Sequence, residues 1–138
     1  MLRLTKQADY GLVLMSHFAG HGGDSVLSAR DLALEAGLPL PTVGKVLKLL
    51  ARAGLLTSQR GVNGGYVMAK QPEEISVAAI VQALEGPIGM TDCAPGGARS
   101  CEHEPHCRVR TPVQRINAVV RETLSKMTLE ELSTSNTP

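Results

Sequence analysis

The sequence predicts a mainly α-helical fold that is interrupted once by a short two-stranded hairpin. Apolar residues recur every three or four positions in several segments, which is the spacing of one face of a helix. The 138 residues include one Phe, two Tyr and no Trp, so the core must be aliphatic. One glycine-rich segment, residues 60–64, lies between two short strand-like runs. A chain of this length has little room for a second independent core.

The first two predicted helices begin at capping residues. Thr5 is the expected N-cap of a helix that extends to about residue 19. Its apolar positions follow helical spacing at Leu4, Ala8, Leu12 and Met15. Ser28 is expected to cap a shorter helix, where the Asp31 carboxylate suits the helix start. Gly37 is expected to end that second helix.

A third helix is predicted from Pro41 to about residue 53, because proline suits the first position of a helix. One side of this helix is apolar, and the other side carries Lys45, Lys48 and Arg52. Two helices joined by a short turn, the second with a basic outer face, make a helix-turn-helix. In that motif the second helix enters the major groove of DNA. A solvated basic face is the alternative interpretation.

Residues 55–59 and 65–69 are predicted strands, joined by a glycine-rich loop. Arg60 in this loop can enter the minor groove or pair with a phosphate, and Gly61 lets the backbone come close to DNA. Asn63-Gly64 is also a favoured dipeptide of tight hairpin turns, whether or not the hairpin contacts DNA. The loop lacks the Gly-Lys-Ser/Thr ending of a phosphate-binding loop and does not open a helix, so nucleotide binding is not expected. A basic hairpin after a basic helix predicts a winged helix-turn-helix with a two-stranded wing.

The second half of the chain combines a short helix, a long loop and a long helix. The short helix follows Ser76 and runs over residues 77–84, and a loop with no useful periodicity covers residues 88–110. The last long helix starts at Thr111-Pro112, and its apolar residues stand at heptad-like positions, namely Val113, Ile116, Val120 and Met127. We expect a DNA-binding head at 1–72, a sensor and dimerisation part at 73–132 and a disordered tail at 133–138.

Charge is distributed unevenly along the chain. Residues 1–70 carry eight Lys and Arg against four Asp and Glu, a net of +4, whereas residues 71–138 carry six against nine, a net of −3. A basic half joined to an acidic half fits a head that binds a polyanion such as double-stranded DNA. No secretory segment and no apolar run of about 18 residues is present, so we expect a cytoplasmic protein without membrane contact.

Three cysteines fall in the long loop. Seven residues separate Cys93 from Cys101, and five separate Cys101 from Cys107. An odd number of cysteines without an export signal argues against a disulfide framework. The short Cys-x-x-Cys pairs of zinc ribbons are absent, so the wide gaps favour an iron–sulfur cluster over zinc or redox-switching thiols. Three cysteines leave one coordination position of such a cluster open, and the candidate ligands nearest in sequence are His103 and His106.

No pattern of catalytic residues emerges from the sequence. There is no nucleophile with a neighbouring base, no paired carboxylates and no cofactor fingerprint. We therefore expect a binding protein and not an enzyme. An iron–sulfur carrier is the rival from another class, but a carrier has little use for a basic wing.

Four stretches of the chain resemble the Rrf2 family of winged-helix regulators, which includes IscR, NsrR and CymR. They are residues 2–5, residues 9–11, residues 46–55 and the wing signature of residues 60–66. The likeness extends from Met1 to about Leu132 and is greatest to members that regulate the SUF iron–sulfur assembly system. It implies a homodimer that binds a palindromic operator. It also implies control, as a repressor, of iron–sulfur assembly genes by a 2Fe–2S or 4Fe–4S cluster.

The resemblance also implies roles for individual residues. Pro41, Thr42 and Lys45 would begin the DNA-facing helix, Arg60, Gly61 and Asn63 would form the wing contact, and Cys93, Cys101 and Cys107 would bind the cluster. Some members complete the cluster with a histidine where this chain has Arg110. Others use an acidic residue of the partner subunit's first helix, which favours Asp9 as the fourth ligand over the loop histidines. Gly44 stands where some members carry a site-selecting glutamate, so their operator preference does not transfer.

Overall fold

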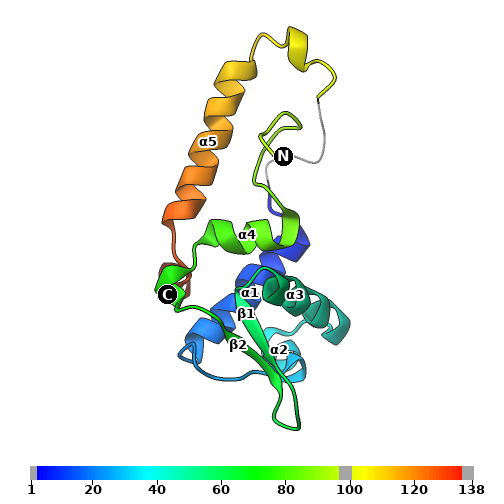
Figure 1. Cartoon of the computed structure of the whole chain (residues 1–138), viewed down its shortest axis with the longest axis vertical. Coiled ribbons are helices and arrows are strands. Elements are labelled where there is room, and N and C mark those ends of the chain that lie inside the picture. The colour runs from blue at the N-terminus through cyan, green and yellow to red at the C-terminus, as the bar shows by residue number, and fades with distance from the viewer. Residues whose placement is uncertain (1–2, 97–100, 135–138) are drawn as a thin grey trace.

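The computed structural model describes residues 3–96 and 101–134 and is mainly helical, as the sequence predicts (Figure 1). Its helices are α1 (Lys6–Gly20), α2 (Ala29–Ala36), α3 (Leu40–Arg52), α4 (Val77–Glu85), α5 (Arg110–Lys126) and α6 (Leu129–Thr134). The strands are β1 (Leu56–Gln59) and β2 (Gly65–Met68), and the 3₁₀ turns are η1 (Pro72–Glu74) and η2 (Glu104–His106). Helix α5 projects from a body that the other helices and the hairpin form (Figure 1).

Three helices start where the sequence predicts a capping side chain. The hydroxyl of Thr5 accepts a hydrogen bond from the Ala8 N–H at 3.1 Å, and Ser28 does the same for the Asp31 N–H at 3.1 Å. Ser76 caps α4 in the same way, at 3.0 Å. Such caps satisfy backbone donors that the helix itself leaves free, which is why these residues fix the helix starts.

The core is aliphatic and draws on α1 to α4, the hairpin and α6. Its fully buried members include Leu14, Phe18, Leu47, Ile80 and Leu129. Helices α1 and α4 approach closely at Gly11, where a Cβ atom would overlap the Leu84 side chain. The same core therefore joins residues on both sides of the boundary that the sequence predicts at residue 72.

A carboxylate and two imidazoles link α1 to α2. Glu35 accepts a hydrogen bond from the His21 ring at 3.1 Å, and the Glu35 carboxylate lies 3.3 Å from His17 Nδ1. The hydrogen bond from His21 is the main reason that the pKa of the Glu35 carboxyl lies below its usual value. Burial opposes this shift, and the charges of His21 and His17 support it. The link holds the first helix of the helix-turn-helix against α1.

The wing is an antiparallel hairpin whose glycines are required by close backbone contacts. Strands β1 and β2 pair from Leu56 with Met68 to Gln59 with Gly65. A Cβ atom at Gly65 would overlap the backbone of Leu27, which pairs with Tyr66 through hydrogen bonds of 2.8 and 2.9 Å. Gly61 has φ of 116°, a backbone conformation that L side chains rarely adopt. The predicted winged helix-turn-helix is therefore present.

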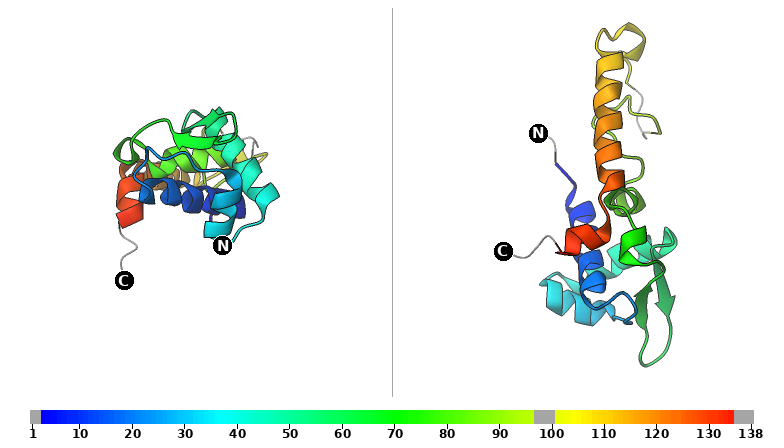
Figure 2. Two further views of the ribbon diagram at one scale, coloured as in Figure 1. Left: turned by 90° about the horizontal axis from the view of Figure 1, so that it is seen from below. Right: turned by 90° about the vertical axis from the view of Figure 1, so that its left-hand side faces the viewer.

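Helix α5 returns to the body through its C-terminal end. Val77 N–H donates to the Met127 carbonyl, and Leu129 N–H donates to the Ile75 carbonyl, each at 2.8 Å. Helix α6 then packs beside α1 (Figure 2). Because α6 extends to Thr134, Ser133 and Thr134 belong to a helix and not to the predicted disordered tail. Residues 135–138 of that predicted tail lie outside the described residues.

The predicted heptad positions of α5 divide between two sides of the helix. Val113 and Val120 are half-buried, on the side that also carries the fully buried Asn117. Ile116 and Met127 are instead exposed, and Val119, which the heptad pattern omitted, is 60% exposed. The chain's own loop and α4 cover the first side, so the exposed stripe keeps Ile116 and Met127 of the predicted set and has Val119 in place of Val120. Among the described residues, no helix has the length and hydropathy needed to cross a bilayer.

Candidate DNA-binding surface and cysteine loop

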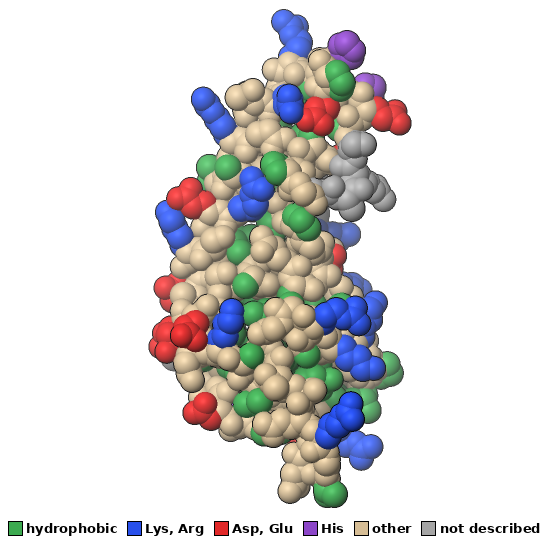
Figure 3. Space-filling view, viewed as in Figure 1, with side chains coloured by type: hydrophobic (Ala, Val, Ile, Leu, Met, Phe, Trp, Pro, Cys, Tyr) green, Lys and Arg blue, Asp and Glu red, His purple; other side chains and the backbone are tan. Residues whose placement is uncertain are grey.

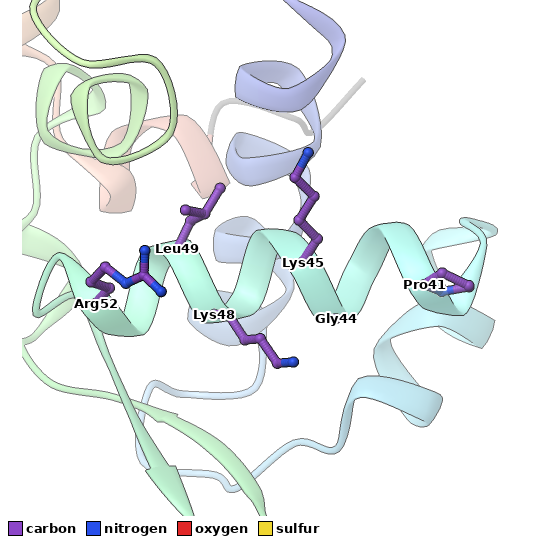
Figure 4. A pocket seen from close by; sticks show the side chains of 6 residues that line it. All are labelled: Pro41, Gly44, Lys45, Lys48, Leu49 and Arg52. Atoms are coloured by element: carbon purple, nitrogen blue, oxygen red, sulfur yellow. The ribbon is translucent and has the colours of Figure 1, made fainter.

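Helix α3 buries its apolar side and presents a basic one. Its buried residues, which recur at helical spacing, are Val43, Val46, Leu47 and Leu50. The opposite side borders a shallow hollow of about 420 Å³, lined by Pro41, Gly44, Lys45, Lys48, Leu49 and Arg52 (Figure 4). Amphipathicity thus fixes the rotation of α3 and turns the basic residues outward.

The predicted DNA-facing residues of α3 are accessible. Pro41, Lys45 and Lys48 are exposed, and Thr42 is half-buried. The two lysine side chains extend to opposite edges of the helix, although both line the same hollow (Figure 4). No side chain caps the N-terminus of α3, so its first backbone N–H groups and the helix dipole favour an anion there.

The wing places three predicted contact residues at its turn. Arg60, Gly61 and Asn63 are all exposed, and the turn is closed by a hydrogen bond from Gly64 N–H to the Gly61 carbonyl at 3.0 Å. None of the ion pairs among the described residues involves Lys45, Lys48 or Arg60. Lys and Arg side chains gather along one side of the lower half of the molecule (Figure 3). This surface has the shape and charge to contact a phosphate backbone and the adjacent groove.

The turn that carries Cys93 is attached to α5. Gln114 Nε2 donates to the Cys93 carbonyl at 2.6 Å, and the Thr91 hydroxyl lies 3.2 Å from Cys93 Sγ. Asn117, which is fully buried in the middle of α5, accepts from the Met90 N–H at 2.8 Å and donates to Thr91 Oγ1 at 3.0 Å. Cys93 is therefore held beside the middle of the long helix.

Cys101 and Cys107 lie on either side of η2, near the start of α5. Glu104 N–H donates to the Cys101 carbonyl at 3.1 Å, and Cys107 N–H donates to the Glu104 carbonyl at 3.2 Å. An ion pair of 3.0 Å joins Glu104 to Arg110, the first residue of α5. His103 and His106 of the same turn are exposed. All three cysteines of the chain are free thiols and partly exposed.

The three thiols have the donor chemistry of a cluster or metal site, but one protomer does not assemble that site. Among the described residues, no three His, Cys, Asp or Glu side chains lie close enough together to hold a metal ion. Asp9 is exposed on α1, where it borders a shallow groove with Ser16 and His17. The loop would therefore have to close around a cluster, and residues 97–100 within it lie outside the described part of the chain.

Sequence reasoning missed the polar residues that hold the cysteine loop. Asn117 was passed over because the heptad pattern drew attention only to apolar positions of α5. A signal was available, because Val113, Asn117, Val120 and Leu124 share one side of a helix at alternating spacings of four and three. A polar residue inside such a stripe requires hydrogen-bond partners when it is buried.

Comparison with known sequences decides the family. The profile of the Rrf2 family, described as an iron-dependent transcriptional regulator, matches residues 4–135. The chain belongs to the Rrf2 family. It is 28% identical over 134 residues to the regulator NsrR of Halalkalibacterium halodurans, covering 97% of this chain and 92% of that protein. It is also 28% identical over 131 residues to IscR of Pectobacterium atrosepticum, covering 95% and 79%.

Solved Rrf2-family structures share the fold. CymR of B. subtilis, the global cysteine regulator, superposes with a TM-score of 0.80 at 31% identity, covering 99% of this chain and all of that one. IscR of T. potens superposes with a TM-score of 0.76 at 25% identity, covering 99% and 89%. The Rrf2 assignment makes this chain a transcriptional regulator of the DNA-binding kind, and it confirms the family that the wing signature predicted.

Proposed function

We propose that this Rrf2-family chain is a homodimeric repressor of iron–sulfur assembly genes, controlled by a cluster held at Cys93, Cys101 and Cys107. One observation carries the proposal. A basic recognition helix and wing, whose Lys45, Lys48 and Arg60 form no ion pair among the described residues, stand on the same core as a long helix that bears a loop with three free thiols. The recognition helix and the wing suit binding to operator DNA in the cytoplasm, and the loop with its three thiols suits a sensor.

Each head of the proposed dimer reads DNA with two elements. The start of α3, with Pro41 and Thr42, faces a phosphate, and Lys45 and Lys48 reach into the major groove or along its edge. In the wing, Arg60 enters the adjacent minor groove, while Gly61 and Asn63 keep the turn narrow. Phosphate contacts position the heads, and base contacts select the operator.

The dimer is proposed to form along α5. Its exposed large apolar residues are Ile116 and Val119, and the residues that cap its two ends, Val109 and Met127, are exposed as well and extend this stripe. Burial of such a stripe against a second copy releases water and stabilises the pair. A two-fold dimer presents two heads to the two halves of a palindromic operator.

The cysteine loop is proposed to hold the cluster, which when bound supplies sensitivity to oxidants, nitric oxide and iron supply. The three thiolates are the protein's own ligands. Asp9 is the favoured fourth ligand, contributed from the partner subunit, as the resemblance to family members that use an acidic residue of the first helix implies. His103 and His106 are the alternatives within the loop.

The proposal is tested on anaerobically purified full-length protein. Wild-type protein is expected to bind iron and sulfide with visible charge-transfer absorption, and to select a palindromic sequence from a random DNA pool. The Cys101→Ser variant should lose the cluster and its effect on DNA affinity while staying dimeric. Wild-type protein that is colourless after reconstitution, or that binds DNA without sequence preference, contradicts the proposal.

A second candidate keeps DNA binding but gives the thiols a zinc or redox role. The redox form of this candidate is favoured by the separation of the thiols in one protomer, because the described ligand types form no metal-binding group there and a zinc site would need one. A colourless protein with one zinc per chain supports the zinc form. Reversible loss of DNA affinity on oxidation without any metal supports the thiol switch.

A further inference from the structure

Asn117 is the one fully buried polar side chain among the described residues, and it lies in the middle of α5. Both ends of its amide are used by the turn that carries Cys93. Oδ1 accepts from the Met90 N–H at 2.8 Å, and Nδ2 donates to Thr91 Oγ1 at 3.0 Å. Thr91 Oγ1 in turn lies 3.2 Å from Cys93 Sγ. A continuous chain of polar contacts thus leads from the interior of α5 to the thiol.

The direction of these hydrogen bonds follows from the donors available. A backbone N–H can only donate, so the atom of Asn117 that faces Met90 must be the oxygen. The amide nitrogen then faces Thr91 and must donate to its oxygen. One lone pair of Thr91 is occupied in this way, and the Thr91 hydroxyl hydrogen remains free for Cys93. With a thiol at Cys93 either atom can be the donor, whereas a thiolate or a ligating sulfur can only accept from the Thr91 hydroxyl.

The turn that bears these residues is tightly packed. Gly89 lies so close to Ala94 that a Cβ atom at Gly89 would overlap the Ala94 side chain. Ala94 N–H donates to the Thr91 carbonyl at 3.1 Å, and Gln114 Nε2 holds the Cys93 carbonyl from α5. The sulfur of Cys93 thus has a defined position relative to the long helix before any ligand arrives.

We propose that Asn117 and Thr91 form a hydrogen-bonded relay that makes the Cys93 sulfur an acceptor and couples its state to α5. Both are positioning residues, since Asn117 orients the Thr91 hydroxyl and Thr91 donates to the sulfur. A change at the sulfur alters the Thr91 hydrogen bond, and that change reaches the buried amide of α5. The relay itself is a property of the protein alone, and only its effect on a cluster rests on the proposed function.

The relay is tested first in reduced protein without a cluster. The chain has only three Asn residues, and the side-chain amide resonances of Asn117 are identified by their loss in Asn117→Leu. We expect Cys93→Ala to shift these resonances, and Cys107→Ala to leave them in place because Cys107 caps η2 instead. In a Thr91→Val background, Cys93→Ala should no longer shift them.

The choice of variants separates coupling from general disruption. Thr91 is exposed, so the change to valine removes the hydroxyl without opening the core. Thr91→Ser keeps the hydroxyl and should restore the response to Cys93→Ala. Unchanged Asn117 resonances in Cys93→Ala, or an equal shift with and without the Thr91 hydroxyl, overturn the relay.

A second measurement uses protein reconstituted with iron and sulfide. A hydrogen bond to a ligating sulfur stabilises the reduced form of a cluster and raises its potential. Thr91→Val should therefore lower the midpoint potential and shift the sulfur-to-iron charge-transfer bands, with the iron content unchanged. Thr91→Ser should return both to the wild-type values. An unchanged potential in Thr91→Val excludes a hydrogen bond to the bound sulfur and overturns this part of the proposal.

The two measurements distinguish a failure of the relay from a failure of the proposed function. If wild-type protein takes up no cluster, the sensor part of the proposed function is wrong, and the resonances of the cluster-free protein alone decide the relay. If a cluster forms but Cys93→Ala does not shift the Asn117 resonances, the relay is wrong and the proposed function stands.

Discussion

Arg60 is the residue through which the wing is expected to contribute most to DNA affinity. It is exposed at the start of the wing loop and takes part in no ion pair among the described residues. Gly61 beside it has a backbone conformation that suits a tight turn. The arginine is thus presented by a narrow loop, with its charge available to DNA.

We predict that Arg60→Ala weakens DNA binding by about tenfold, which corresponds to about 1.4 kcal/mol and lies within the range for one lost specific contact. Fluorescence anisotropy with the selected operator measures the affinity. Arg115→Ala, which removes the same charge from an exposed position of α5, is the matched control. Equal weakening by both variants would mean that net charge, and not the wing contact, determines affinity.

The link of Glu35 to His17 and His21 makes a contribution to stability whose pH dependence has a known sign. The hydrogen bond from His21 is the main cause of the lowered pKa of the Glu35 carboxyl. A carboxyl with a depressed folded-state pKa stabilises the fold above its unfolded-state pKa, and this contribution is lost as the pH falls through the folded-state value. Because the group is exposed, the contribution is small.

We predict that Glu35 titrates below an ordinary glutamate, and that His21→Ala moves its midpoint back toward the ordinary value. Carbon-detected NMR of the Glu35 carboxyl follows the titration directly. His103→Ala, which removes an exposed histidine at the N-cap of η2, should leave the midpoint in place. A midpoint that is insensitive to His21 would show that the hydrogen bond is absent in solution.

At the scale of elements, short-range rules predicted the helix starts and the wing. Thr5, Ser28 and Ser76 each cap a helix because a side-chain oxygen three residues before a backbone N–H needs no distant partner. The glycines of the wing signature were also predictable as turn residues. The contact of Gly65 with Leu27 was not, since it joins segments that are far apart in sequence.

The face of α5 and the cysteine loop could not be predicted in the same way. Helical spacing alone does not say which side of α5 the chain's own loop covers, and that loop shifts the exposed stripe to Ile116 and Val119. The positions of Cys93 and Asp9 likewise depend on tertiary contacts. The sequence therefore predicted the ligand types but not whether one protomer brings them together.

We predict that Ile116→Asp separates the dimer. The substitution places a carboxylate on each copy where about 1.5–3 kcal/mol of apolar burial is expected per side chain, so dissociation should become at least ~100-fold easier. Sedimentation equilibrium at micromolar concentration measures the change. Ser125→Asp adds the same carboxylate to an exposed position of α5 and should leave the dimer intact. An intact Ile116→Asp dimer would place the interface elsewhere.

At the scale of the whole molecule, basic charge lies on one side of the body. Residues 1–70 carry a net charge of +4 and residues 71–138 a net charge of −3. Because α4 and α6 of the second part pack against α1, both parts share one body, and the field that attracts a polyanion arises from one side of it. In the view of Figure 3, basic side chains gather beside the lower body while acidic side chains lie mostly on the other side. The small overall charge of +1 conceals this polarity.

We predict a steep salt dependence of operator binding. If Lys45, Lys48 and Arg60 of both heads each neutralise one phosphate, the logarithm of affinity should fall with the logarithm of salt concentration with a slope of about −5. A titration from low to high salt measures it. Lys45→Ala should reduce the slope by about two, because each dimer loses two contacts. A flat salt dependence would exclude this surface as the DNA contact.

The burial of Leu129 has a consequence for how the protein is made. This leucine comes after the long helix, yet it is fully buried in the core with residues of α1 and α3. The first helices therefore find this core neighbour only after residue 129 has been synthesised. The DNA-binding head is completed only once α5 has been made, so the helix that we propose pairs two copies is already present when a newly made head folds.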